Sequence, residues 1–517
     1  MLCAILSVVR NIPVTMATQH PDNACAPWWK EDAFVATQDE IEEVMILFKD
    51  LPVDEYMWDW EGKYVDEAVG EKLFSRGQKL FLKHPLGTDL HLTYRIPAFD
   101  GEKMHRMARA FMNVLALADL SKDIGIKRPP VTEMFLPLTT DSRQPIKVRE
   151  AFKEIAAYHR SVFHRGKKGD TDLLKMFDVT PLVEDVASLL NIERIVAPYW
   201  KKLLKECPEA KQRGQRLFLA RSDPAMNAGL VPAVLAVKVA LSLAKGVADD
   251  CDMDVFPILG TGSLPFRGSV NPTYLDTFMP QYAGVRTYSI QSAFRYDYPK
   301  DDVSKALKRM QKEVPKHRIV SVSDTDRKNI GKLCKVFTDI WRPTIESIAP
   351  LINQVAAYLP QRRERLQHIG LFGYSRGVGK VRLPRAIGFT GALYSLGVPP
   401  ELIATGRGLV RAGEMGLLDV IEKHYPALRE DLKHAGKYLN RENLSLLGKK
   451  KSVFREIERD IDAIEKILEI ELGPEKPRHI IHRNLTSSIY QRLMTGGPKE
   501  GIQRDLIEAA VIRRSLG

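Results

Sequence analysis

The sequence has few cysteines, and their spacing excludes the structures that depend on paired thiols. Only five cysteines occur among 517 residues, they are odd in number, and no two lie close together. Such spacing predicts neither a disulfide framework nor a zinc knuckle. A reducing compartment suits this pattern, so we expect a cytoplasmic protein.

Long apolar runs are also missing. A membrane-spanning helix needs about 20 apolar residues, and a long apolar stretch such as Val231–Ala244 is shorter and contains Lys238. The apolar first residues have no basic segment before them, unlike a secretory signal peptide. We expect no membrane partner, and we interpret residues 1–15 as an N-terminal extension with Met16 as an alternative start.

Low-complexity linkers and repeats are absent as well, so the simplest organisation is one decorated domain over residues 1–517. The net charge of +12 permits nucleic-acid binding, attraction of small anions or a plain basic surface. The densest basic run, Lys449–Lys451, has no interleaved aromatic residues that could stack on bases. We therefore favour the basic surface and expect no nucleic-acid partner.

Short apolar runs recur along the chain, and each ends in polar, glycine or charged residues before a stretch with helical periodicity. We interpret eight of them as β-strands: Tyr56–Trp60, Leu90–Tyr94, Glu133–Leu138, Val179–Val183, Arg216–Ala220, Val255–Leu259, Val285–Ile290 and Ile369–Phe372. Strands that alternate with helices are typical of parallel α/β folds.

Eight strands are the number that closes a (β/α)₈ TIM barrel, and an open doubly wound sheet is the alternative. We favour the barrel because all eight runs end in polar or glycine-rich residues, as expected at one active-site face. A helical insert from Asp301 to about Arg365 and a helical C-terminal region after Pro400 would supply additional helices around it.

Two carboxylates, Glu184 and Asp223, stand just beyond two predicted strands, so both could point at one centre of a barrel. No set of histidines or cysteines accompanies them, and hard oxygen donors suit Mg²⁺ or Mn²⁺ better than zinc. The alternative for Asp223 is a helix cap, because Pro224 follows it in the manner of a first helical turn.

Arginines also gather at predicted strand ends. A guanidinium group can bind carboxylate or phosphate through two parallel hydrogen bonds, which indicates a small polyanionic substrate. Any one of them could be an ordinary salt-bridge residue, but five share the predicted rim: Arg95, Arg221, Arg267, Arg376 and Arg385. The glycine-rich segments 260–268 and 373–379 match neither a Walker A motif nor a Rossmann fingerprint.

His20 precedes Pro21, which favours an extended loop conformation for the histidine. A lone loop histidine is usually just exposed to solvent. Its setting among rarer residue types makes it a candidate proton-transfer group.

Several longer strings resemble archaeal-type phosphoenolpyruvate carboxylase: Met16–Asn23 (MATQHPDN), Met57–Lys63 (MWDWEGK), Phe218–Asn227 (FLARSDPAMN) and His368–Arg376 (HIGLFGYSR). The resemblance runs from about Asn11 to Gly517. It implies a cytoplasmic homotetramer of TIM barrels that uses Mg²⁺ or Mn²⁺ to convert phosphoenolpyruvate and bicarbonate to oxaloacetate and phosphate, replenishing C4 acids. In that family's mechanism, carboxyphosphate and a metal-bound enolate form first, and the enolate then captures carbon dioxide.

Similarity to the strings of larger bacterial and plant relatives implies roles for individual residues. His20 would be the base that deprotonates carboxyphosphate, Arg267 a catalytic arginine, and Glu184 and Asp223 the metal ligands. The substrate-binding residues would be Arg95, Arg221, Arg376 and Arg385. Arg221 is included because Met226 occupies the position of a lysine in the relatives, and Arg221 could replace that lysine. An earlier loop histidine and arginine of the relatives have no counterpart in this sequence.

Two other classes compete with this interpretation. A phosphoenolpyruvate mutase-like lyase or a pyruvate kinase would share the metal and the arginines but would not need bicarbonate. A nucleic-acid-binding protein would make His20 and Glu184 irrelevant and would bind less tightly as salt rises. At the end of the chain, Arg514–Gly517 faintly resembles a feedback-inhibition segment of the relatives, but its Ser515 and Leu516 argue against sensitivity to aspartate.

Overall fold

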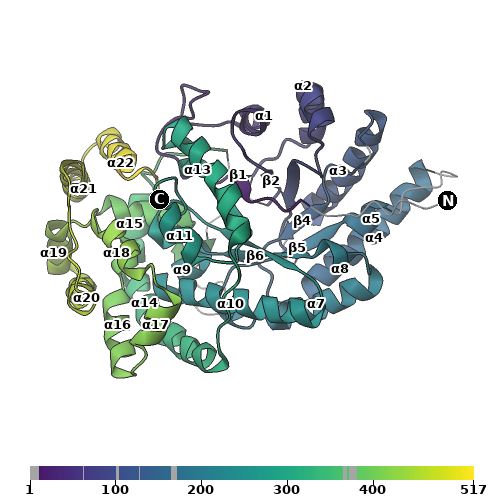
Figure 1. The fold of residues 1–517 in the computed structure, drawn as a ribbon. Helices are drawn as coiled ribbons and strands as arrows, with labels where there is room; N and C mark the ends of the chain where they lie inside the picture. Colours follow the sequence, from purple (N-terminus) through teal and green to yellow (C-terminus); the bar gives the residue numbers. More distant parts are fainter. Residues whose placement is uncertain are drawn as a thin grey trace.

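The fold is a closed barrel of eight parallel strands surrounded by helices (Figure 1). A computed structural model describes residues 11–61, 63–99, 104–126, 128–164, 172–364, 370–371 and 381–517. The barrel strands are β1 (Thr15–Thr18), β2 (Glu55–Asp59), β3 (His91–Arg95), β4 (Glu133–Leu136), β5 (Asp178–Val183), β6 (Gln215–Ala220), β7 (Val255–Gly260) and β8 (Thr287–Ile290). They pair in chain order, and β8 closes onto β1. The predicted α/β TIM barrel is confirmed.

One predicted strand was wrong. Of the run at 369–372, the structure describes Gly370–Leu371 (β9), which lies outside the barrel and pairs antiparallel with Arg382–Leu383 (β10) in a separate two-stranded sheet. The eighth barrel strand is β1, a four-residue strand that was not among the eight predicted runs. The residues before β1 also join the barrel: Val14 O accepts a hydrogen bond from Tyr288 N at 2.9 Å.

The barrel interior holds an apolar layer above a buried ionic layer. The apolar cluster consists of side chains from several strands: Met16, Met57, Phe135, Leu182, Phe218, Ala220 and Ile258. Beneath it, Arg216 donates to Glu55 at 2.7 Å and to Glu133 at 2.9 Å, and all three are buried. These residues stand at or next to the first positions of their strands, so they close the N-terminal end of the barrel. Only the opposite end is left for a site.

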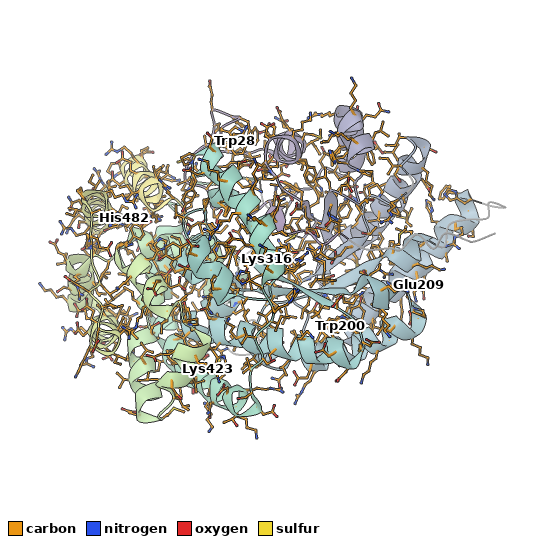
Figure 2. The ribbon with its side chains drawn as sticks, viewed as in Figure 1. Trp28, Trp200, Glu209, Lys316, Lys423 and His482 are labelled. Atoms are coloured by element: carbon orange, nitrogen blue, oxygen red, sulfur yellow. The ribbon has the colours of Figure 1, made fainter. Side chains whose placement is uncertain are left out.

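Helices follow each barrel strand in the chain and bury an apolar face against the barrel. They are α1 (Glu40–Asp50), α2 (Val69–Lys83), α3 (Met104–Asp123), α4 (Arg143–Phe163), α5 (Asp172–Met176), α6 (Val186–Leu190), α7 (Glu193–Glu206), α8 (Ala210–Arg213), α9 (Ser222–Ala228), α10 (Leu230–Asp250), α11 (Leu275–Gln281), α12 (Ser292–Tyr296) and α13 (Lys300–Glu313). Figure 2 shows the side chains on this frame, among them Trp200 of α7, which is fully buried.

Among the described residues, α10 is the one helix long and apolar enough to cross a membrane, and 72% of its most apolar window is buried inside the fold. A core helix of this kind passes the same test of length and composition. In the structure α10 packs between the barrel and α14 (Asp324–Ala356).

The additional helices cover one side of the barrel, as Figure 1 shows. The long α14 begins where Ser323 caps the backbone N–H of Asp326 at 3.1 Å. It is followed by α15 (Ala386–Ser395), α16 (Thr405–Glu414), α17 (Leu418–His424), α18 (Leu428–Gly436), α19 (Arg441–Lys450), α20 (Val453–Leu468), α21 (Pro477–Thr495) and α22 (Lys499–Arg513). The predicted helical insert and helical C-terminal region are confirmed.

These helices form their own apolar core. In α20 the buried residues recur every three or four positions, at Phe454, Ile457, Ile461, Ile464 and Leu468, which directs one stripe inward. The helical core and the barrel core share Val186, Leu190 and Leu243 at their margins. The helical region therefore rests directly on the barrel near α6 and α10.

Candidate active site

A cavity of about 140 Å³ lies at the C-terminal ends of the barrel strands. Every strand contributes to its lining, either with its last residues or with the loop that follows. Six of the eight predicted site residues line it: His20, Arg95, Glu184, Asp223, Arg267 and Arg385. The fold therefore brings together residues that lie up to 365 positions apart in sequence: five come from the ends of barrel strands, and Arg385 comes from the N-cap of α15.

The two predicted metal ligands are half-buried and form an acidic pair at the cavity. Glu184 follows β5, and Asp223 lies in the first turn of α9, whose N-cap position is Arg221, so Asp223 does not cap the helix. Burial raises the pKa of Glu184 well above its usual range, and the charge of Asp223 raises it further. Burial also raises the pKa of Asp223, although the charge of Arg385 opposes this.

A third carboxylate, Glu61, lines the cavity and was not predicted from the sequence. Its charge raises the pKa of both Glu184 and Asp223. Three carboxylates on one cavity supply hard oxygen donors and concentrate negative charge in one part of its lining. The arrangement therefore fits a divalent cation such as Mg²⁺ or Mn²⁺, which would offset that charge.

Arg95 is held at the rim by a fork of two hydrogen bonds. Its Nε donates to Asp59 Oδ1 at 3.0 Å, and its Nη2 donates to Asp59 Oδ2 at 2.6 Å. Arg95 Nε also lies 3.6 Å from Glu61 Oε2. Because the planar guanidinium is fixed by Asp59, it is presented to the cavity in one orientation.

Arg267 connects four segments of the chain. From η2 (Pro265–Arg267), its guanidinium donates to Asp22 Oδ2 at 3.1 Å, to Gly517 O at 2.6 Å, and to Ser222 Oγ at 3.2 Å, and it also donates to Gln291. Burial lowers the pKa of Arg267, and the charge of Asp22 opposes this. These contacts hold the arginine against the cavity wall.

The glycines of the 260–268 segment make room for this arginine. A Cβ atom at Gly262 would lie 2.6 Å from Arg267 Cζ, which is closer than atoms can approach. Gly268 ends the turn with φ +115°, a conformation that L side chains rarely adopt. The glycine-rich composition thus serves the placement of Arg267.

One predicted arginine, Arg221, does not line the cavity, and another, Arg376, is not described by the structure. Arg221 is fully buried outside the cavity lining, and its guanidinium donates to Tyr282 Oη at 3.0 Å and to Phe266 O at 3.1 Å. Arg221 therefore supports the turn that carries Arg267. Arg376 lies outside the described residues, as does the 373–379 segment.

His20 follows β1 and lines the cavity. Its Nδ1 lies 2.9 Å from Thr18 Oγ1, and its carbonyl accepts a hydrogen bond from Ser292 N at 3.3 Å. Both contacts fix the loop in which the imidazole stands. The ring therefore reaches the same space as the carboxylates and the arginines.

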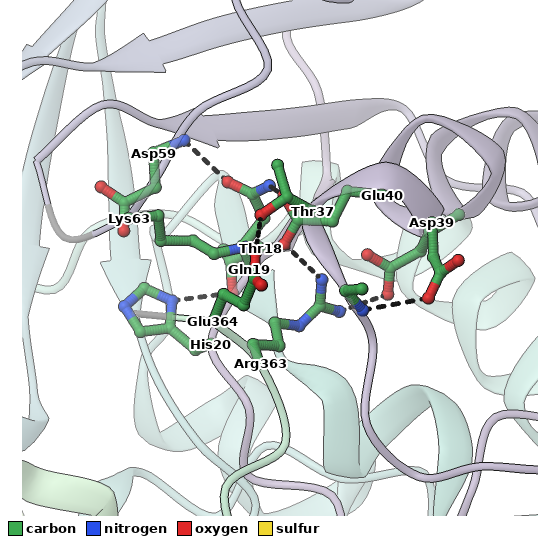
Figure 3. A network of polar contacts seen from close by, with 12 residues as sticks. Thr18, Gln19, His20, Thr37, Asp39, Glu40, Asp59, Lys63, Arg363 and Glu364 are labelled. Carbon is green, nitrogen blue, oxygen red and sulfur yellow. Dashed lines mark hydrogen bonds and ion pairs between the residues drawn. The ribbon is translucent and has the colours of Figure 1, made fainter. Parts of the chain in front are cut away.

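A polar network behind His20 anchors the end of β1 (Figure 3). Gln19 donates to Glu40 Oε2 at 2.6 Å and accepts from Asp59 N at 2.8 Å, so it ties β1 to α1 and β2. Glu40 is paired with Lys63 and also accepts from Arg363 at 3.1 Å. All of these side chains are buried.

TIM-barrel enzymes have their active sites at the C-terminal ends of the strands, where this chain gathers carboxylates and arginines. The fold and the site therefore define a TIM-barrel enzyme. Over residues 12–517 the chain matches the family model for phosphoenolpyruvate carboxylase, and it belongs to that family. A phosphoenolpyruvate carboxylase of Metallosphaera sedula is 37% identical over 98% of this chain and 100% of its own length. Relatives of the same name from Leuconostoc mesenteroides and Picrophilus torridus are each 35% identical over 98% of this chain and 99% and 100% of their own lengths. The archaeal-type resemblance is confirmed.

Gly517 fills a position beside Arg267 where no side chain fits, so we expect Gly517→Ala to impair the site. A Cβ there would lie 2.1 Å from Ile387 O and 2.4 Å from Gly391 N, which forces the Gly517 carbonyl away from Arg267. Since small misplacements at a site are costly, kcat/KM for oxaloacetate formation should fall about 10- to 100-fold.

The matched control is Gly473→Ala, because a Cβ at Gly473 meets no atom within 4 Å. Steady-state kinetics of both variants check the expectation. Equal kcat/KM for the two variants would contradict a role for Gly517 in holding Arg267.

Proposed function

We propose that this protein carboxylates phosphoenolpyruvate with bicarbonate, giving oxaloacetate and phosphate and so replenishing C4 acids. The observation that carries the proposal is the convergence of His20, Glu184, Asp223 and three arginines on one cavity. A chain of this family needs such a set for a reaction that concentrates negative charge on phosphoryl and enolate oxygens.

The substrate anion would be bound by Arg95, Arg267 and Arg385. Arg95 and Arg267 are buried and fixed by Asp59 and Asp22. Guanidinium groups held in this way can bind phosphate and carboxylate oxygens without a further cost of ordering. Arg376 remains a predicted phosphate ligand on the resemblance alone.

Glu184 and Asp223 would hold Mg²⁺ or Mn²⁺ through their carboxylate oxygens, with Glu61 as a third negative charge nearby. When bound, the divalent cation supplies Lewis-acid stabilisation of the charge that develops as the phosphoryl group departs.

His20 would act in the second half of the reaction. Bicarbonate oxygen attacks the phosphoryl phosphorus, the bond from phosphorus to the enol oxygen breaks, and carboxyphosphate and the enolate of pyruvate result. His20 then accepts the proton of the carboxyphosphate carboxyl group, carbon dioxide leaves, and the proton goes to the departing phosphate. The enolate carbon attacks carbon dioxide and forms the new bond of oxaloacetate.

The position of the cavity at the end of a closed barrel supports this sequence of steps, since carboxyphosphate and the enolate both react with water and need a site that limits its access. His20 lies just after β1, Asp223 lies in the first turn of α9 after β6, and Arg267 lies in η2 after β7, so each of these residues is held close to the end of a barrel strand. We further propose, on the family resemblance, a cytoplasmic homotetramer with one domain over residues 1–517 and no nucleic-acid or membrane partner.

The proposal is tested by measuring oxaloacetate formation with Mg²⁺ in carbonate-free buffer, before and after adding bicarbonate. We expect product only with bicarbonate, released together with phosphate in equal amounts. A phosphoenolpyruvate mutase-like lyase or a pyruvate kinase would act without bicarbonate and form no oxaloacetate. Folded, metal-supplied protein that makes no oxaloacetate would overturn the proposal.

A further inference from the structure

We propose a second metal site, for Zn²⁺ or a similar transition-metal ion, formed by Asp119, His159 and His164. Asp119 lies near the end of α3, His159 lies in the last turns of α4, and His164 is the C-cap of α4. One ligand atom from each residue lies within 4.8 Å of the others. Within the described ranges, this is the one group of three or more acidic, histidine or cysteine side chains that meets this geometry.

The distances match those between ligands of one small ion. His164 Nε2 lies 2.9 Å from Asp119 Oδ2, and His159 Nε2 lies 3.6 Å from the same oxygen. In a tetrahedral zinc site with bonds of about 2.0 Å, neighbouring ligand atoms stand about 3.3 Å apart. The centroids of the two imidazole rings are 5.4 Å apart, and both rings approach the same carboxylate oxygen.

The site has room for one ion and a largely apolar wall. A cavity of about 20 Å³ is lined by the three ligands, and this is enough space for one water-sized particle. Leu115, Ala118, Ala156 and Leu173 form the wall, and Arg160 adds one positive charge. The ligand side chains are only 12% to 30% exposed, so water competes weakly for the ion.

The donor set selects the class of metal. Two imidazoles with one carboxylate suit Zn²⁺, Co²⁺ or Ni²⁺ and offer little to Mg²⁺, which prefers oxygen. The active-site carboxylates have the opposite preference, so the two sites would hold different ions.

Its place in the fold gives the ion a structural role. The helices α3 and α4 follow β3 and β4 and lead back toward the N-terminal end of the barrel, and the ligands stand near their far ends, away from the active-site cavity. The ion would join two neighbouring helices that otherwise meet through side-chain packing. The proposal does not depend on the reaction that the barrel catalyses.

The test measures zinc retained by the full chain after removal of any affinity tag. The protein is treated with a chelator, supplied with excess Mg²⁺ to fill the active-site carboxylates, mixed with Zn²⁺ and desalted. We expect about one zinc ion per chain in the wild type, by mass spectrometry of the metal, and far less in the His159→Gln/His164→Gln variant. Zinc should raise the Tm of the wild type but not that of this variant.

The matched control is His84→Gln, because His84 Nδ1 lies 3.5 Å from Asp89 Oδ2 in an exposed pair without a second histidine. It should retain zinc as the wild type does, and Asp119→Asn should lose it with both histidines intact. Equal zinc in the double variant and the wild type, or no zinc in the wild type, would overturn the proposal. Oxaloacetate formation should be unchanged in all four proteins.

Discussion

His20→Asn is expected to lower the rate of oxaloacetate formation by about 10³-fold, the magnitude typical of losing a general base. Asparagine has no group that accepts a proton at neutral pH, but it is polar and similar in size. It can replace the contact of His20 with Thr18, which spans 2.9 Å. The loop after β1 should therefore keep its conformation, and the loss should report proton transfer.

The step at which His20 acts predicts a second effect. Because the proposed proton transfer follows attack by bicarbonate, release of phosphate from phosphoenolpyruvate should persist in His20→Asn while oxaloacetate disappears. Parallel assays of phosphate, pyruvate and oxaloacetate separate the two steps. His105→Asn, an exposed substitution on α3, should match the wild type. Equal loss of phosphate and oxaloacetate would place His20 in the first step instead.

Glu184→Gln is expected to lower activity by at least about 10³-fold, or roughly 4 kcal/mol of transition-state stabilisation, because one of two proposed metal ligands is lost. The metal-free variant should nevertheless be more stable than the metal-free wild type. Burial and the charge of Asp223 raise the pKa of Glu184, so its ionised form destabilises the fold. Glutamine removes that charge while keeping the shape.

The raised pKa of Glu184 also determines how the stability of the metal-free protein changes with pH. A carboxyl group with a raised pKa in the folded state binds more protons there than in the unfolded chain, so metal-free stability falls as pH rises above about 4.3. Glu184→Gln should reduce this fall.

Thermal unfolding with and without Mg²⁺ measures both effects of this substitution. Mg²⁺ at about 100 times its Kd should stabilise the wild type by about 2.7 kcal/mol and the variant much less. The exposed Glu209→Gln, at a position labelled in Figure 2, should behave as the wild type. An unchanged Mg²⁺ response in Glu184→Gln would place the metal elsewhere.

Most of the barrel could be predicted because β2 to β8 carry enough apolar residues to be recognised locally. The first strand could not, since Thr15–Thr18 contains two threonines and an alanine, and its burial depends on β2 and β8. The run at 369–372 has stronger local character than β1, yet Gly370 and Leu371 pair with the segment beside α15. Local composition does not show which strand closes a barrel.

In the site as well, residues whose position follows from the local sequence could be predicted, and residues placed by distant partners could not. Glu184 and Asp223 were predicted from their positions after strands, and Glu61 has the same position after a predicted strand, a signal that could have found it. Arg221 and Arg267 could not be distinguished, because the direction of Arg221 depends on Tyr282, a partner 61 positions away. Arg267 depends on Asp22, Gln291 and Gly517, which lie 24 to 250 positions from it.

The contacts around Asp22 and Arg267 have a consequence for how the molecule folds. Asp22 lies just after β1, yet its carbonyl accepts hydrogen bonds from Leu516 N and from Ser515, which is 493 positions away. Contacts of such long range require the largest loops to close, so they form late. During synthesis most of the barrel and the helical region can fold before these contacts form. The catalytic cavity is then completed last, and partly folded chains would be inert toward a substrate whose intermediates react with water.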